Sequence, residues 1–357
     1  MPELVVIAEQ LRAPVPGGTG RYTAELLAAL TRAAPPGWTV TTVTAWHRER
    51  LAGARRIPLP RRGLTAVWER GLPLWPGGDS VHAPTPLAPP RARRGLVVTV
   101  HDTVPFTHPE TLTPRGAAWH RAAITRAVRT ASAVVVPTEA VAAELRHHAP
   151  GPAPVHVIGH GVPDVLRREP DAAEVARLAD LPDGFVLAVG TIEPRKGLGT
   201  LVEAMARPEA PDLPVVIAGP QGWGGVDLPA VAAAHGLPAG RVHLLGRVTD
   251  AELALLLRRA TVLAAPSLAE GFGLPVLEAM ALGLPVVHSD VPALVEVSGG
   301  AAVVTPRGDT GALADALCMA ARGELAGLVA QARRRAADFT WSAAADAVWK
   351  VHVRAFR

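Results

Sequence analysis

Charged residues and glycines gather in two short segments, and each segment directly follows an apolar, β-branched run. The first segment covers residues 190–197 and contains Arg195 and Lys196 in a glycine-bounded turn. Only two of the 36 basic residues are lysines, so Lys196 beside an arginine stands out. Two adjacent cations are the groups that grip a diphosphate. We therefore expect this turn to bind one, with a solvated charge pair as the alternative.

The second segment, residues 266–280, opens a predicted helix with Gly271 and Gly273. Glycines there present backbone amides at the positive end of the helix, where a second part of the same phosphate group can bind. Glu270 precedes the helix, and Glu278 lies within it on an apolar face. A buried carboxylate needs hydrogen-bond donors, which a ribose diol supplies. The alternative is a solvated Glu278.

Two further polar segments follow predicted strands in the first half of the chain. Residues 17–22, with Gly18 and Thr19, open a predicted helix and are expected to form a phosphate-binding loop or a plain glycine turn. They do not match G-x-G-x-x-G, so a dinucleotide fingerprint is not supported. His101 and Asp102 follow the apolar strand Leu96 to Val100, where they could touch a reacting sugar or an acceptor hydroxyl or merely cap the strand.

The sequence does not favour a metal site. His156 and His160 lie on a predicted strand and turn, where a four-residue offset separates them by roughly 13 Å. The single cysteine, Cys318, excludes a disulfide framework and a cysteine-based zinc site. We expect no metal and no cofactor.

Short apolar runs alternate with helical patterns along the whole chain, which is typical of parallel sheets built from βαβ units. The expected strands of the first half are 4–8, 40–45, 80–83, 96–100, 133–136 and 155–158. Those of the second half are 185–189, 215–218, 242–245, 262–265, 286–288 and 301–304. A linker is expected between Gly161 and Gly184, and a capping box at Thr249–Glu252 begins a helix. The predicted fold class is α/β, with two doubly wound, Rossmann-like domains.

Composition narrows the classes of function. The chain has 357 residues, 49% of them hydrophobic and 19% charged, which indicates a two-domain globular protein. A net charge of +4 with arginine-rich usage points to codon bias, and no nucleic-acid partner is expected. No stretch of about 18 apolar residues occurs, and the first residues lack a signal-peptide pattern. These features predict a cytoplasmic protein.

Taken together, the motifs resemble those of the retaining glycosyltransferases of family 4, which have the GT-B fold. The E-x7-E signature is present as Glu270 and Glu278, within the run Glu270-Gly271-Phe272-Gly273-Leu274-Pro275. The remaining motifs of the family occur in the same order along nearly the whole chain: residues 18–22, 101–102, 157–162 and 195–197. The resemblance implies an acceptor-binding domain over 1–165, a donor-binding domain over 166–338 and a helix over 339–357 that returns to the first domain across a central cleft.

The resemblance also implies roles for individual residues. Glu270 would contact the hydroxyls of the donor sugar, and Glu278 the nucleotide ribose. Arg195 and Lys196 would hold the diphosphate and stabilise the leaving group. The other implied donor contacts are the glycine that ends the first strand of the second domain, the amides at the start of the helix, and the N-terminal loop: Gly190, Phe272, Gly273, Leu274, Gly18 and Thr19. His101 would lie near the transferred sugar.

One departure from some relatives matters. They have a basic residue after Gly190, where this chain has Thr191, so neutralisation of the diphosphate rests on Arg195 and Lys196. Breaking the sugar-phosphate bond creates an anion that cations and helix amides can stabilise without a metal. Retention would follow from attack on the same face, with the departing phosphate oxygen as base and no protein nucleophile.

The sequence therefore predicts a hexosyltransferase that uses a nucleoside diphosphate sugar and a saccharide, lipid-linked or small-molecule acceptor. The alternatives are another GT-B enzyme of epimerase or synthase type, or a non-catalytic nucleotide-sugar-binding protein. The loop from His101 to Glu110 is most similar to polysaccharide mannosyl- and rhamnosyltransferases, which favours GDP-mannose. The arginine-rich segment 48–70, with Trp68 and Trp75, is either a membrane or lipid diphosphate contact at the inner membrane face or a codon-biased exposed loop.

Overall fold

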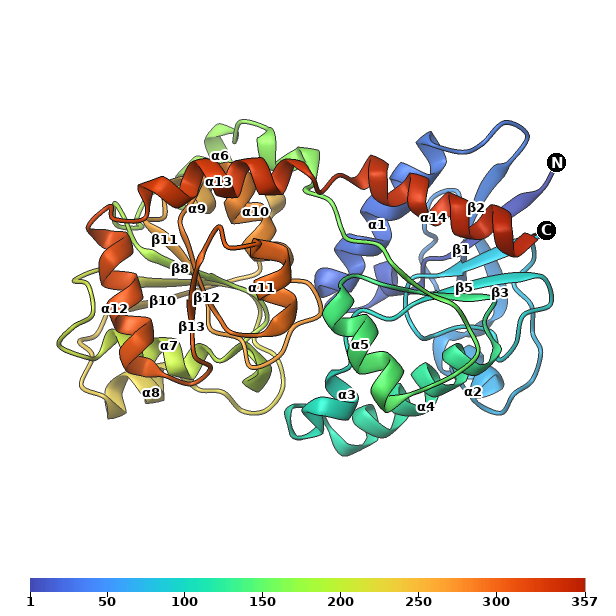
Figure 1. Ribbon diagram of the computed structural model, residues 1–357, viewed down its shortest axis with the longest axis horizontal. Helices are drawn as coiled ribbons and strands as arrows, with labels where there is room; N and C mark the ends of the chain where they lie inside the picture. The colour runs from blue at the N-terminus through green and yellow to red at the C-terminus, as the bar shows by residue number, and fades with distance from the viewer. Residues whose placement is uncertain (357) are drawn as a thin grey trace. The chain divides into compact units, whose positions relative to one another are not determined.

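The computed structural model describes residues 1–356, which form two compact units (Figure 1). Unit 1 comprises Met1–Gly161 and the chain from Thr340 onward, and unit 2 comprises Val162–Phe339. The divisions expected after residues 165 and 338 thus lie after Gly161 and after Phe339. Each unit is described separately below.

Unit 1 is built on a parallel seven-stranded sheet with the order β3-β2-β1-β4-β5-β6-β7. The strands are β1 (Glu3–Ile7), β2 (Thr39–Trp46), β3 (Arg55–Pro60), β4 (Ser80–Ala83), β5 (Gly95–Thr99), β6 (Ala133–Val136) and β7 (Val155–Val157). The helices are α1 (Gly17–Arg32), α2 (Arg61–Glu69), α3 (Val104–Thr107), α4 (Pro114–Thr130), α5 (Glu139–His148) and α14 (Trp341–Phe356), with short 3₁₀ turns η1 (Glu9–Arg12) and η2 (Pro109–Thr111).

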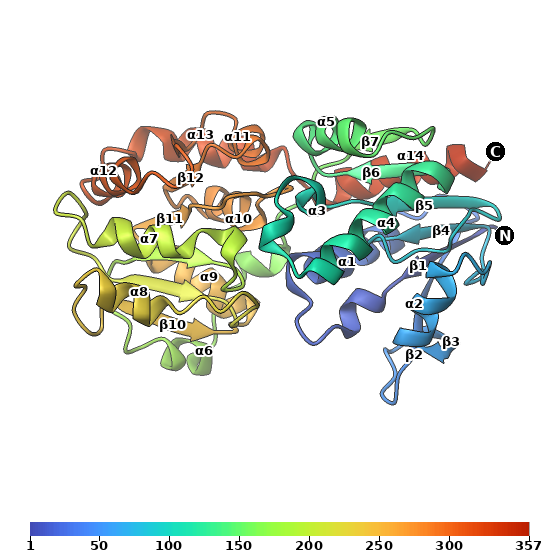
Figure 2. The same cartoon turned by 90° about the horizontal axis from the view of Figure 1, so that it is seen from below.

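Helices cover both faces of this sheet, as Figure 2 shows. Successive residues of a strand point to opposite faces. Leu4 and Val6 of β1 accordingly pack in the cluster that contains α1 and α14, whereas Val5 and Ile7 pack in the cluster that contains α2. Burial of both faces explains why the central strands β1, β5 and β6 are nearly continuous apolar runs.

Unit 2 has a parallel six-stranded sheet with the order β10-β9-β8-β11-β12-β13. Its strands are β8 (Val186–Val189), β9 (Val215–Ala218), β10 (Val242–Gly246), β11 (Val262–Ala265), β12 (Val286–Ser289) and β13 (Val303–Thr305). Its helices are α6 (Ala172–Arg177), α7 (Leu198–Met205), α8 (Leu228–Ala234), α9 (Asp250–Arg259), α10 (Leu274–Leu282), α11 (Pro292–Ser298), α12 (Thr310–Ala321) and α13 (Ala326–Ala337), with 3₁₀ turns η3 (Asp164–Arg167) and η4 (Pro194–Lys196). The expected α/β class with two doubly wound sheets is confirmed.

The expected capping box is also confirmed, because Thr249 Oγ1 accepts from the Glu252 amide and Glu252 accepts from the Thr249 amide at 2.6 Å. Glu252 is buried and also accepts two hydrogen bonds from Arg177 of α6. Residues 161–184 were expected to be a linker, and the structure corrects this prediction. Arg258 and Arg259 of α9 donate to carbonyls of this stretch, so it is packed onto unit 2.

The terminal helix α14 packs on α1 and on strands β4, β5 and β6, which confirms that the chain returns to unit 1. Buried side chains tie it to the sheet through successive hydrogen bonds: Tyr22 Oη to Thr99 Oγ1 (3.0 Å), Thr99 Oγ1 to His82 Nε2 (3.3 Å), His82 Nδ1 to His352 Nε2 (3.0 Å) and His352 Nδ1 to Ser80 Oγ (2.7 Å). Burial lowers the pKa of His82 to about 3, with a smaller contribution from His101. Burial also holds the pKa of His352 well below its usual value. Both imidazoles are therefore neutral at pH 7.

Ser80 Oγ donates to the Gly95 carbonyl at 3.3 Å. This contact sets the direction of all the hydrogen bonds in the series. Because that proton is used, Ser80 Oγ accepts from His352 Nδ1, and His352 Nε2 then accepts from His82 Nδ1. His82 Nε2 accepts from Thr99 in turn. The hydrogen bonds thus run in one direction from α1 to α14, and each neutral imidazole has one donor and one acceptor role.

Two local predictions for unit 1 were wrong. Residues 17–22 form the first turns of α1 rather than a loop, so Gly18 and Thr19 are helical. Residues 48–70 are not one exposed loop, because they contain β3 and α2. Trp68 of α2 is 1% exposed and donates to the Leu74 carbonyl, so it cannot reach a membrane.

Candidate functional site

The predicted donor residues of unit 2 lie at the carboxyl ends of two adjacent strands. Gly190 follows β8 and leads to η4, which contains Arg195 and Lys196. Glu270 follows β11 and leads to α10, which contains Glu278. The strand order reverses between β8 and β11, and ligands of open α/β sheets bind at such reversals. The fold therefore brings the two motifs together, although 74 residues separate Lys196 from Glu270 in sequence.

Glu270 bridges both cations. Its Oε1 accepts from Lys196 Nζ at 2.6 Å, and its Oε2 accepts from Arg195 Nη1 at 2.9 Å. The side chains of Glu270 and Lys196 are only 11% and 14% exposed, so water screens the pair weakly. Burial raises the pKa of Glu270, but the charges of Lys196 and Arg195, together with hydrogen bonds from Lys196 and Ser267, outweigh burial and lower it to about 2. Glu270 is ionised at neutral pH.

Residues that the motif search missed hold this cluster. Glu193 Oε1 accepts from Arg195 Nη2 at 2.7 Å, and Ser267 Oγ donates to Glu270 Oε1 at 2.8 Å. Ser289 Oγ, at the end of β12, donates to the Ser267 carbonyl at 2.5 Å. Glu193 and Ser267 lie within the two predicted segments and could have been found there. Ser289 is linked to them only through the order of the strands.

Two glycines of this site are required by close approaches of neighbouring elements. Gly197 has φ +61°, and a Cβ there would overlap the carbonyl oxygen of Pro266. Gly273 has φ +90° at the N-cap of α10, and a Cβ there would overlap Leu294. The η4 turn and the loop before α10 are thus in direct contact, and the Leu268 amide donates to the Arg195 carbonyl at 2.8 Å.

The start of α10 is packed firmly onto unit 2. Phe272 is 4% exposed, and its ring lies 5.7 Å from that of Phe339. Glu278, in the second turn, is 2% exposed, which agrees with the predicted buried carboxylate and excludes the alternative of a solvated side chain. A cavity of about 20 Å³ lies against Lys196, Glu270 and Gly273, which is room for about one water molecule. This space is too small for a diphosphate in the present arrangement of the side chains.

In unit 1, His101 lies at the carboxyl end of β5. Its Nε2 is 2.7 Å from the Pro84 carbonyl oxygen, which can only accept, so Nε2 carries the proton. Burial lowers the pKa of His101, against smaller opposing effects of Pro84 and Asp102. The ring of Tyr22 packs edge-on against it at 4.6 Å. His101 is neutral at pH 7, and its Nδ1 is a hydrogen-bond acceptor.

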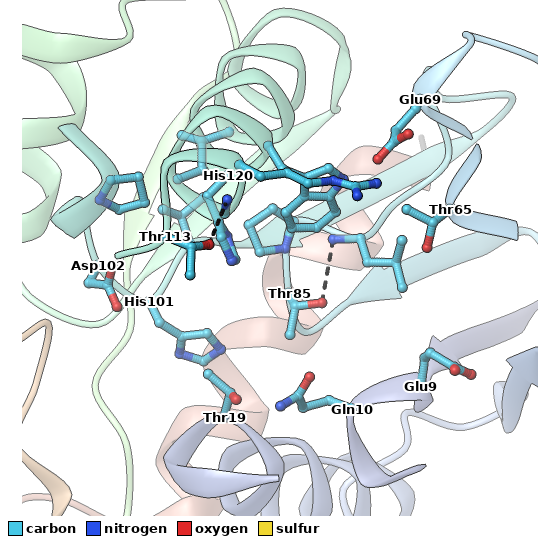
Figure 3. Close-up of a pocket in the computed structure, with 18 of the residues that line it drawn as sticks. Glu9, Gln10, Thr19, Thr65, Glu69, Thr85, His101, Asp102, Thr113 and His120 are labelled. Atoms are coloured by element: carbon cyan, nitrogen blue, oxygen red, sulfur yellow. Dashed lines mark hydrogen bonds between the residues drawn. The ribbon is translucent and has the colours of Figure 1, made fainter. Parts of the chain in front are cut away.

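His101, Asp102 and Thr19 line a cavity of about 640 Å³ within unit 1 (Figure 3). Glu9 and Thr85, which follow β1 and β4, line it too, so this cavity lies where the strand order reverses in the first sheet. Asp102 lies on one side of the view, Thr65 and Glu69 on the other, and His120 between them. Gly18 is not among the lining residues.

Sequence comparison identifies the family. The family model "Glycosyltransferase Family 4" matches residues 16–165, and "Glycosyl transferases group 1" matches residues 183–322. The D-inositol 3-phosphate glycosyltransferase of Jonesia denitrificans is 33% identical over 310 residues, which cover 80% of this chain and 70% of that protein. The chain belongs to glycosyltransferase family 4.

Other members of the family align over a shorter part. The O-antigen chain mannosyltransferase B of Escherichia coli is 34% identical over 163 residues, 44% of this chain and 42% of that protein. The chain spans about half the length of the first curated relatives that it matches.

Solved structures share the fold. Sucrose-phosphate synthase from Thermosynechococcus elongatus superimposes with a TM-score of 0.77 at 23% identity and covers 99% of both chains. Anabaena HepE, solved in complex with UDP-glucose, has a TM-score of 0.72 at 20% identity and covers 98% of this chain and 99% of that chain. The GT-B fold expected from the motifs is confirmed.

Among residues 1–356, no group of three or more His, Cys, Asp or Glu side chains is arranged to hold a metal ion. Within the same residues, no helix is both long enough and apolar enough to cross a bilayer.

Proposed function

We propose that this family 4 protein is a retaining glycosyltransferase that moves a hexose from a nucleoside diphosphate sugar to an acceptor hydroxyl. One observation carries the proposal: Glu270 bridges Arg195 and Lys196 where the strand order of unit 2 reverses. The cluster presents two cations for a diphosphate and one ionised carboxylate for sugar hydroxyls.

The chemistry follows from charge. When the donor binds, its diphosphate takes the place of Glu270 beside Arg195 and Lys196, and Glu270 accepts hydrogen bonds from the sugar. Cleavage of the bond between the anomeric carbon and the phosphate oxygen leaves the electron pair on the phosphate. The two cations and the amides at the start of α10, from Phe272 to Leu274, stabilise that charge.

The sugar then has oxocarbenium character. The acceptor hydroxyl attacks the same face, and its proton passes to the departing phosphate oxygen, so the anomeric configuration is retained. This route requires no metal and no protein nucleophile. Gly190 lets the chain approach the phosphates closely, and Glu278 of α10 binds the ribose.

We assign the donor to unit 2 and the acceptor to the cavity in unit 1. His101 supports this assignment, because its Nδ1 can accept a hydrogen bond from a sugar hydroxyl, and Thr19 lies in the same wall. Gly18 acts through the first turn of α1. The relatives include mannosyltransferases, which supports GDP-mannose over UDP-sugars as the donor.

The arginine-rich segment supports a peripheral membrane contact, but through other residues than those expected from the sequence. Trp68 is excluded, but several arginines around β3 are exposed and Trp46 at the end of β2 is 52% exposed. The exposed arginines are Arg48, Arg50, Arg55, Arg61, Arg62 and Arg70. They provide attraction to an anionic membrane face. Flotation with liposomes that does not depend on anionic lipid would rule this contact out.

A thermal-shift panel of nucleoside diphosphates and their sugars tests the donor. A ligand at 100 times its Kd adds about 2.7 kcal/mol of stability, so the true donor stands out. Turnover of that donor then separates the alternatives. A non-catalytic binding protein would be stabilised without releasing nucleoside diphosphate, and an epimerase would change the sugar without transferring it.

A further inference from the structure

The cavity in unit 1 offers a ligand several side-chain hydrogen-bond acceptors. Three lining side chains spend donors within the protein. Gln10 Nε2 donates to the Pro16 carbonyl at 2.9 Å, Thr19 Oγ1 donates to the same carbonyl at 3.1 Å, and His101 Nε2 donates to Pro84 at 2.7 Å. Gln10 and Thr19 keep oxygen lone pairs, and His101 keeps Nδ1. All three can therefore accept from a ligand.

The carboxylates of the lining add further acceptors. Asp102 Oδ1 accepts from the Val104 amide at 3.2 Å, which leaves its other oxygen for a ligand. Glu69 is exposed at the end of α2 and faces the cavity across from Asp102 in Figure 3. Thr65, Thr85 and Thr113 contribute hydroxyls, which can accept or donate. Hydroxyl groups, which bring protons, suit such a lining.

The charges of the lining do not favour an anion. Its three carboxylates are Glu9, Glu69 and Asp102, and its two guanidinium groups are Arg61 and Arg115. Glu9 is 2% exposed and accepts from the Ala45 amide and His47, and Arg61 lies 3.9 Å from it. Arg61 is thus already partly neutralised.

The two imidazoles add no positive charge at pH 7. Burial lowers the pKa of His120, against a smaller opposing effect of Asp102, just as burial lowers that of His101. A phosphate group in this cavity would therefore meet three carboxylates and two neutral imidazoles against two guanidinium groups, of which Arg61 is already paired with Glu9.

We propose that this cavity selects an uncharged, polyhydroxylated acceptor such as an unphosphorylated saccharide or cyclitol, and discriminates against its phosphomonoester. The selection rests on the proposed function, in which the cavity holds the acceptor. The carboxylates and His101 Nδ1 accept hydrogen bonds from the hydroxyl groups of the ligand. Trp119, which also lines the cavity, supplies apolar surface for the ring carbons. The inference separates this chain from the relatives whose names carry D-inositol 3-phosphate.

Binding by NMR line broadening and transfer measured by mass spectrometry test the inference on the full chain. The probes are methyl α-mannoside, N-acetylglucosamine and myo-inositol, each compared with its monophosphate. At least one uncharged probe should bind about tenfold more tightly than its phosphate, because phosphate oxygens bring no protons and meet like charge. Tighter or equal binding of every phosphate, or no binding of any uncharged probe, would overturn the proposal.

Variants identify the groups responsible. The double variant Glu69→Gln/Asp102→Asn should bind the uncharged probe more weakly and its phosphate more tightly. The ratio of the two affinities should fall by about tenfold. Glu110→Gln, an exposed carboxylate outside the lining, should leave the ratio unchanged. A ratio unmoved by the double variant would contradict the role of the carboxylates. Binding without transfer would instead count against the proposed function, so the two failures are distinguishable.

Discussion

The ammonium group of Lys196 lies 2.6 Å from Oε1 of Glu270, in the turn where a diphosphate is expected to bind. In the proposed function, the carboxylate of Glu270 holds the position that the donor's phosphates take. Because Arg195 shares the same carboxylate at 2.9 Å, we expect both cations to exchange partners when the proposed donor binds. The hydroxyl groups of the donor sugar can then donate hydrogen bonds to Glu270 in place of those from the two cations. A nucleoside diphosphate alone has no sugar hydroxyls to donate there.

Replacement of Lys196 should abolish most turnover. Lys196→Ala removes a cation that stabilises the leaving group, and loss of one such interaction lowers kcat by about 10² to 10³. The chain provides a matched control in Lys350→Ala, its only other lysine, which lies on α14. Release of nucleoside diphosphate from the donor measures both. Equal turnover by the two variants would refute the assignment.

The ion cluster should make stability depend on pH in the acid range. Since the folded pKa of Glu270 is lowered to about 2 from 4.5, ionised Glu270 stabilises the fold above pH 4.5, and this contribution is lost as the pH falls towards 2. Its size is up to about 3 kcal/mol. Urea unfolding of wild type and Glu270→Gln should differ at pH 6 and converge near pH 2. A difference that does not vary with pH would argue against the ion cluster.

The hydrogen-bonded pair of His82 in β4 and His352 in α14 should make the stability of unit 1 sensitive to acid as well. The folded pKa of His82 is lowered to about 3, so its neutral form stabilises unit 1 above pH 6.5, and this contribution is lost progressively as the pH falls towards 3. His82→Gln can still form hydrogen bonds but does not titrate. Between pH 6.5 and 4, wild type should therefore lose stability faster than the variant. The reverse order in chemical unfolding would disprove a neutral His82.

Gly197 should tolerate no side chain. Gly197→Ala combines a left-handed backbone, φ +61°, with overlap on the Pro266 carbonyl, and should destabilise the protein by about 1–3 kcal/mol. Gly199→Ala is the matched control, because it lies in α7 with nothing within 4 Å of a new Cβ and should stabilise the helix by about 0.5–1 kcal/mol. Denaturant midpoints give both signs, and a stable Gly197→Ala would contradict the close approach of the two turns.

Local sequence patterns predict strands that are buried on both faces. The expected strands 80–83, 133–136, 215–218 and 262–265 match the observed bounds of β4, β6, β9 and β11. The edge strand β3 was missed because arginines and prolines dominate it, and Ile57 is its only buried residue. Edge strands need one protected face only, so their pattern is weak.

The site was predictable to the extent that its chemistry lies within motifs. Arg195 and Lys196 were predicted from composition and spacing, and Glu270 from the E-x7-E resemblance. Their mutual contact depends on β8 lying beside β11. The role of Ser289 depends on β12 in the same way. The contact of Glu270 with Lys196 and Arg195 arises from the tertiary structure. Each motif taken alone predicts a different ligand group as the partner of Glu270 and of Lys196.

The most direct test of the exchange at Glu270 is calorimetric titration of wild type and Glu270→Gln with the nucleoside diphosphate and with its sugar. Without a competing carboxylate, the variant should bind the nucleoside diphosphate about tenfold more tightly. Its affinity for the nucleotide sugar should not increase, because the variant loses the hydrogen bonds between the Glu270 carboxylate and the sugar hydroxyls. The control Glu169→Gln, an exposed residue of unit 2, should resemble wild type. Weaker binding of the nucleoside diphosphate by Glu270→Gln would contradict the account.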